Sequence, residues 1–131
     1  MDKNSKNYHD WVIKAENDLK ASIAIYEYYE DPPTDTICYH CHQTAEKSLK
    51  GFLVFHKTKL HKIHDLIALL NICLTQDKTL EFLREDLETL NQYYIETKYP
   101  PDMPLDYPKE EAREAIDKAK IILDSIKDKL E

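Results

Sequence analysis

The sequence of 131 residues contains a single glycine, Gly51. Tight β-turns and phosphate-binding loops depend on glycine, because glycine adopts positive φ angles without a steric penalty. All-β folds and doubly wound α/β folds are therefore disfavoured, and every glycine-rich nucleotide-binding motif is excluded. Any nucleotide that this chain binds must be held without a phosphate loop.

Apolar side chains recur at alternating spacings of three and four residues along most of the chain. This is the period of an amphipathic α-helix. It predicts helices over about residues 7–29, 35–57, 64–74, 78–97 and 108–130. The predicted fold is all-α, an antiparallel up-and-down bundle of four long helices plus one short helix, forming one domain over residues 1–131. Gly51 lies inside the second helix, where it costs about 1 kcal/mol relative to alanine, so we expect a neighbouring backbone to approach closely there.

Prolines and capping residues mark the ends of these helices. The pair Pro32-Pro33 breaks the first helix. Thr34 or Asp35 is expected to cap the second helix, and Asp77 the fourth. Pro108 opens the last helix in the first-turn position that proline favours.

The formal net charge is −7, and all but two of the 18 basic residues are lysines. A protein that coats duplex DNA normally has the opposite charge balance, so no duplex DNA partner is expected. No apolar run is long enough to cross a bilayer, and the first residues lead into an amphipathic segment rather than a signal core. We expect a cytoplasmic protein without membrane contact.

The three cysteines, Cys38, Cys41 and Cys73, lie within apolar helical stripes. An odd number in such positions predicts buried free thiols rather than disulfides. The run Cys38-Tyr39-His40-Cys41-His42 resembles half of a zinc site, but structural zinc sites pair two such knuckles. A Cys–His nucleophile would need an exposed thiolate, which internal thiols do not supply. We expect neither metal nor cofactor.

Polar residues of the second helix share one face. Gln43, Glu46, Lys47 and Lys50 stand at positions i, i+3, i+4 and i+7. The ordinary interpretation is a solvated face on which Glu46 pairs with Lys50. Asp18 of the first helix could face either lysine, and the sequence does not choose between them.

Four short sequence motifs follow one another along the chain, and one of them contains the polar face of the second helix. The first helix holds Trp11 followed by Ala15-Glu16 and Asp18-Leu19, and the second holds the run from Gln43 to Lys50. His64-Asp65-Leu66 opens the third helix, and Lys98-Tyr99-Pro100 ends the fourth. In order and separation these motifs resemble the HEPN domain family over roughly residues 8–130.

The resemblance implies a helical bundle that usually dimerises. Many small members are encoded beside a minimal nucleotidyltransferase in a toxin–antitoxin-like pair, and a nucleotide-binding role is proposed for the family. Other members are metal-independent ribonucleases that use an arginine followed four to six residues later by a histidine. The only arginines here are Arg84 and Arg113, and no histidine follows His64, so that motif is absent. Lys98 stands where relatives often carry arginine, and lysine lacks the planar fork that clamps phosphate.

We therefore expect a protein that acts by association rather than catalysis. Expected partners are a second copy, bound through an apolar face that includes Trp11, Ile23 and Ile25, and a minimal nucleotidyltransferase. The expected site for a nucleotide or RNA is a groove lined by Gln43, Glu46, Lys47, Lys50, His64, Lys98 and Tyr99. There the lysines would meet phosphates and Tyr99 would stack on a base.

Two alternatives stay open. The first is a ribonuclease toxin with a degenerate active site, in which Lys98 or His64 replaces the missing pair. The second is a purely structural bundle whose polar groove is a satisfied network.

Overall fold

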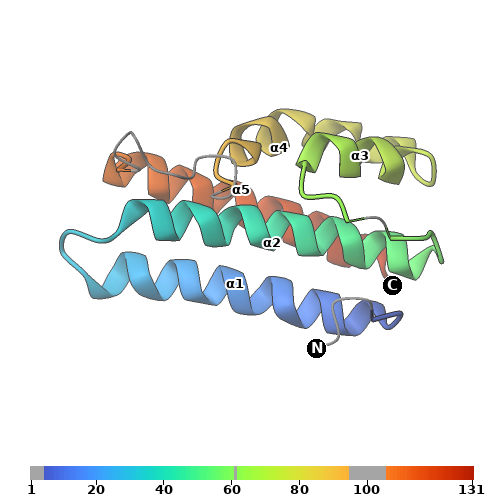
Figure 1. Ribbon diagram of the computed structural model, residues 1–131, viewed down its shortest axis with the longest axis horizontal. Coiled ribbons are helices and arrows are strands. Elements are labelled where there is room, and N and C mark those ends of the chain that lie inside the picture. Colours follow the sequence, from blue (N-terminus) through green and yellow to red (C-terminus); the bar gives the residue numbers. More distant parts are fainter. Residues whose placement is uncertain (1–4, 61, 95–105) are drawn as a thin grey trace.

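The computed structural model describes residues 5–60, 62–94 and 106–131, and all regular secondary structure in these ranges is helical. The elements are α1 (Tyr8–Tyr28), α2 (Thr34–Phe55), α3 (Leu66–Leu74), the 3₁₀ helix η1 (Lys78–Leu83), α4 (Arg84–Asn91) and α5 (Lys109–Lys129). The long helices α1 and α2 run antiparallel, α5 lies behind α2, and α3 and α4 form a shorter layer along the other edge (Figure 1). The predicted all-α bundle is confirmed.

The fourth predicted helix differs in its detail. It begins as the 3₁₀ helix η1, continues as α4 and ends at Asn91. Residues 92–94 of the expected helix are not helical, and residues 95–97 lie outside the described ranges. Asp77 caps it as predicted, because its carboxylate accepts the Thr79 backbone N–H at 2.9 Å. A spacing of three between Leu80 and Leu83 suits a 3₁₀ turn as well as an α-helix, so apolar periodicity does not separate the two.

The predicted cap of α2 is wrong. Pro33 occupies the N-cap position without a side-chain hydrogen bond, and Thr34 is the first helical residue. The Thr34 hydroxyl instead donates to Asp106 at 3.1 Å and accepts the backbone N–H of Tyr107 at 2.9 Å. The start of α2 is thereby tied to the segment that leads into α5, and Pro108 is the N-cap of α5 rather than part of its first turn.

Helix α2 is the centre of the bundle. It packs against α1, α3, α4 and α5, so most of its surface is buried. The thiols of Cys38, Cys41 and Cys73 are fully buried, as predicted. A polar side chain on α2 must therefore meet a neighbouring helix or lie in a cleft between helices. Within the described residues no helix is long and apolar enough to span a membrane.

Gly51 allows α1 to approach α2 closely. A Cβ at this position would lie 3.2 Å from the Cβ of Trp11 and 3.7 Å from the carbonyl oxygen of Tyr8. The expected close approach is confirmed.

The three side chains from which a dimerisation face was expected are wholly or partly buried within the bundle. Trp11 is only 4% exposed, and its indole N–H donates to the carbonyl of Ser5 at 2.9 Å. Ile23 and Ile25 pack against the core of the same chain. These three side chains stabilise the bundle itself, because the apolar surface of α1 turns toward α2 and α5.

Candidate ligand-binding site

A buried carboxylate on α2 organises the polar site. Glu46 is 4% exposed, and its Oε2 accepts the Lys50 ammonium at 3.0 Å. Nδ1 of His64, two residues before α3, lies 3.1 Å from the same oxygen and 3.2 Å from the other. Lys50 itself is 7% exposed. The Glu46–Lys50 pair is present as predicted, but it is buried beneath the segment that precedes α3 and is not exposed to solvent. Each of the two charges is therefore stabilised mainly by the other.

His42 extends the site inward, one turn before Glu46. Its ring is fully buried, and Nδ1 lies 3.3 Å from the side-chain amide nitrogen of Gln43. Nε2 has no hydrogen-bond partner of standard geometry among the described residues, although the His64 backbone is near enough to act on the ring. Burial lowers the pKa of His42 to about 4, against the opposing charge of Glu46, so the ring is neutral at pH 7.

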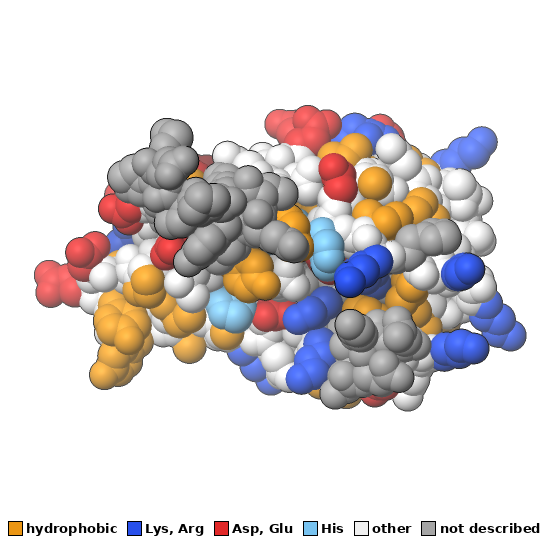
Figure 2. Space-filling view, in the orientation of Figure 1, with side chains coloured by type: hydrophobic (Ala, Val, Ile, Leu, Met, Phe, Trp, Pro, Cys, Tyr) orange, Lys and Arg blue, Asp and Glu red, His pale blue; other side chains and the backbone are white. Residues whose placement is uncertain are grey.

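Three aromatic rings form a column beside this carboxylate. Tyr94 stacks on His42 with ring centroids 5.3 Å apart, and on His64 with centroids 4.9 Å apart and ring planes 16° from parallel. The His64 side chain is 37% exposed, so the column runs from the interior to the surface. Figure 2 shows histidine and basic side chains gathered over the middle of α2 on this face.

Lys47 does not join Glu46. Its ammonium lies 2.6 Å from Oδ2 of Asp18 on α1, and Nδ1 of His40 lies 2.9 Å from Oδ1 of the same carboxylate. Burial raises the pKa of Asp18, but the hydrogen bonds from His40 and Lys47 outweigh it, so this pKa lies below its usual value. The sequence did not decide whether Asp18 faces Lys47 or Lys50, and in the structure Asp18 pairs with Lys47.

The predicted groove is therefore divided into two clusters. Glu46, Lys50 and His64 come together, Gln43 joins them through His42, and Lys47 belongs to the Asp18 cluster. Lys98 and Tyr99 lie outside the described residues.

His42 and Tyr94 were not among the predicted site residues. The spacing of His42, Glu46 and Lys50, four residues apart in each step, was the available signal for His42. No comparable pattern pointed to Tyr94.

The cysteine and metal interpretations find no support in the geometry. Burial raises the pKa of both Cys41 and Cys73 to about 12, so neither thiol ionises near neutral pH. Their expected internal position is confirmed. In the described parts of the chain, no three side chains of His, Cys, Asp or Glu are arranged to hold a metal ion.

The fold and site define a small all-α domain whose central helix carries a buried carboxylate between an ammonium and an imidazole. The chain belongs to the HEPN domain family, whose model matches residues 8–129. The resemblance seen in the sequence motifs is confirmed.

Two solved structures share this fold. TT1696 from Thermus thermophilus is 28% identical, with a TM-score of 0.77, over 96% of this chain and 100% of that one. ST0689, described as an archaeal HEPN homologue, is 25% identical, with a TM-score of 0.74, over 97% of this chain and 100% of that one. None of the curated proteins compared with the chain matches it.

Proposed function

We propose that this protein acts by association, binding a nucleotide at the Glu46 cluster and pairing with a minimal nucleotidyltransferase. The observation that carries the nucleotide proposal is the ring column of His42, Tyr94 and His64, which reaches the surface beside Glu46. A nucleobase is a flat ring with hydrogen-bonding edges. It stacks on the outer ring of such a column while its edge meets the polar groups beneath.

The positions of the arginines support a binding role rather than the family's ribonuclease chemistry. Arg84 forms hydrogen bonds with Glu81 and Asn71, and Arg113 pairs with Asp117 on the exposed side of α5. Neither arginine contacts the Glu46 cluster, and this sequence contains no arginine followed at the required spacing by histidine. Neither arginine therefore supplies the Glu46 cluster with the guanidinium that the family's catalytic motif requires.

Calorimetry with a panel of AMP, ADP, ATP and GMP tests the nucleotide proposal. Stacking on one aromatic side chain contributes about 1–3 kcal/mol, so His64→Ala is expected to weaken binding by about fivefold or more. His9→Ala is the matched control, because His9 is an exposed histidine near the start of α1. The proposal fails if no nucleotide binds, or if the two variants lose affinity equally.

Association is tested with two further measurements. Light scattering on the purified chain measures whether a homodimer forms, and exposed apolar side chains for such a contact exist at Ile13, Tyr28 and Phe82. Co-expression with a minimal nucleotidyltransferase from the same genome, followed by affinity capture, tests the second partner. A monomer that captures no nucleotidyltransferase contradicts the association proposal.

One observation favours the ribonuclease alternative. His64 is held through Nδ1 by a buried carboxylate and is partly exposed, which is how a general base is commonly positioned. If His64 acts in this way, the protein cleaves RNA in the presence of EDTA, and both His64→Ala and Lys98→Ala abolish cleavage. RNA that stays intact with the wild-type protein leaves the binding proposal as the better account.

A further inference from the structure

A second polar region lies two turns further along α2. A pocket of about 630 Å³ opens where the segment before α1 meets the end of α2 and the connector toward α3. Its described lining residues are Ser5, Lys6, Val54, Lys57, Thr58, Lys59 and Leu60. Val54 is four residues, about 6 Å, beyond Lys50 along the helix, and no residue of the Glu46 cluster lines this pocket. Its volume is in the range of small-molecule sites.

The charge of this pocket is unlike that of the α2 groove. Lys47 and Lys50 are already paired with Asp18 and Glu46. Over the described ranges, by contrast, no carboxylate lines the pocket, and no ion pair involves any of its three lysines. The nearby Asp10 carboxylate accepts the Ser5 hydroxyl at 2.6 Å and forms no ion pair with any of these three lysines. Among the described residues, these three ammonium groups therefore have no ion-pair partner, in a chain whose net charge is −7.

The backbone conformation at Lys57 is unusual for a lysine. Lys57 has φ 56°, and it follows α2 in a Schellman arrangement: its N–H bonds to the Val54 carbonyl, and the Thr58 N–H bonds to the Leu53 carbonyl. Glycine is the usual residue there, because a Cβ is unfavourable at positive φ. Backbone geometry therefore does not favour lysine at position 57. The positive charge of lysine would be favoured there by an anionic ligand in the pocket.

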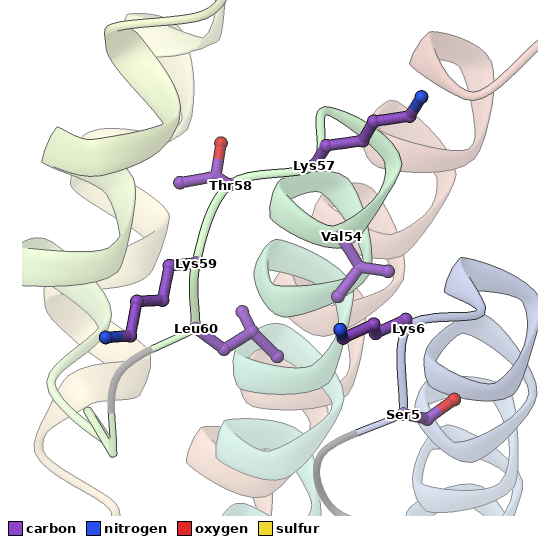
Figure 3. A pocket seen from close by; sticks show the side chains of 7 residues that line it. All are labelled: Ser5, Lys6, Val54, Lys57, Thr58, Lys59 and Leu60. Atoms are coloured by element: carbon purple, nitrogen blue, oxygen red, sulfur yellow. The ribbon is translucent and has the colours of Figure 1, made fainter.

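The arrangement of the lining indicates what kind of ligand fits. In Figure 3, Lys6, Val54 and Leu60 point toward the space between the two segments, whereas Lys57 and Lys59 extend to opposite sides. One ammonium group, that of Lys6, lies beside the apolar side chains of Val54 and Leu60, and two more are carried on flexible stems at either side; together they suit a ligand with several anionic oxygens and a carbon or ring portion. Lysine stems are flexible, so the outer two ammonium groups can turn toward such a ligand.

We propose that this lysine pocket is a second binding site, which takes a phosphorylated small molecule with more than one anionic group. The phosphates would contact Lys6, Lys57 and Lys59, and the remainder of the ligand would rest on Val54 and Leu60. The proposal is independent of the nucleotide site at Glu46.

Calorimetry with tripolyphosphate, and then with ATP, tests the proposal on the full chain. The double variant Lys57→Gly/Lys59→Gln removes two pocket charges, and glycine at position 57 suits the backbone, so this variant is expected to fold. The control Lys20→Gln/Lys120→Gln makes the same change in net charge at exposed positions of α1 and α5. We expect the tripolyphosphate Kd to rise at least tenfold in the pocket variant and less than twofold in the control.

Equal weakening in both variants, or no tripolyphosphate binding to the wild type at millimolar concentration, overturns the proposal. His64→Ala separates this test from that of the nucleotide site. Tripolyphosphate binding that survives His64→Ala supports the pocket even if the nucleotide proposal fails. Tripolyphosphate that does not bind, together with ATP binding that depends on His64, overturns the pocket alone.

Discussion

The ammonium of Lys50 and the carboxylate of Glu46 lie 3.0 Å apart, one turn from each other on α2, and both side chains are buried. A surface pair at this spacing would contribute little, because water screens it. Here each charge has lost most of its hydration, and the other charge replaces it. The pair, with His64 above it, is therefore sensitive to the loss of one member and less so to the loss of both.

Glu46→Gln is expected to lower the free energy of unfolding by about 3–5 kcal/mol, because it leaves the Lys50 ammonium buried without a counter-charge. Lys50→Met should cost a similar amount by leaving the carboxylate with His64 alone. The double variant Glu46→Gln/Lys50→Met should be more stable than the sum of the single losses predicts. Urea unfolding of all four proteins measures the coupling, and additive losses would show that the two charges do not depend on each other.

His42 makes stability depend on pH. Burial lowers its pKa from 6.5 to about 4, so between these values the unfolded chain binds a proton that the folded chain does not. Its contribution is complete above pH 6.5 and is lost as the pH falls toward 4, with a slope of at most about 1.4 kcal/mol per pH unit.

His42→Phe keeps a ring against Tyr94 and removes the titrating group. Unfolding free energies between pH 4 and 7 should then show a shallower slope than in the wild type, and a higher stability at pH 5. His9→Gln, at an exposed position, is the control and should leave the slope unchanged. A His42→Phe profile that parallels the wild type would mean that His42 is not buried in its neutral form.

Gly51→Ala tests the contact between α1 and α2. Alanine favours a helix by about 1 kcal/mol over glycine, but the new methyl group would lie 3.2 Å from the Cβ of Trp11. The Trp11 Cβ is fixed by its backbone, and its indole is buried and hydrogen-bonded. Overpacking costs about 1–3 kcal/mol, so we expect a net loss of about 1 kcal/mol and a lower Tm. A raised Tm would show that α1 moves aside at little cost.

Asp18→Asn is expected to destabilise the protein by about 1.5–3 kcal/mol, because it weakens the charged hydrogen bonds from Lys47 and His40. The lowered pKa of Asp18 means that this contribution is present above the pKa of the unfolded chain, 3.8, and is lost as the pH falls through the lower folded value.

Asp117→Asn is the matched control, since Asp117 forms an exposed pair with Arg113 on α5. That variant should cost less than about 1 kcal/mol. Chemical unfolding at pH 7 and at pH 3 measures both changes. Equal effects of the two substitutions would place Asp18 among ordinary surface charges.

The helices and most of the core were predictable from the sequence because burial follows local periodicity. An apolar stripe that repeats every 3.6 residues along a helix has to be buried, whichever element packs against it. For the same reason Cys38, Cys41 and Cys73 were correctly predicted to be internal, and Gly51 to mark a close approach. Periodicity did not separate the 3₁₀ helix η1 from an α-helix, because a spacing of three residues satisfies both.

The partners of the polar side chains were decided only by the tertiary structure. Spacing placed Glu46, Lys47 and Lys50 on one side of α2. Whether Asp18 meets Lys47 or Lys50 depends on how α1 and α2 are rotated and crossed, which their packed side chains determine together. The column through Tyr94 likewise joins residues far apart in the chain, so no local pattern specifies it. Local chemistry determined which segments become helices, and packing between helices decided which charges become buried pairs.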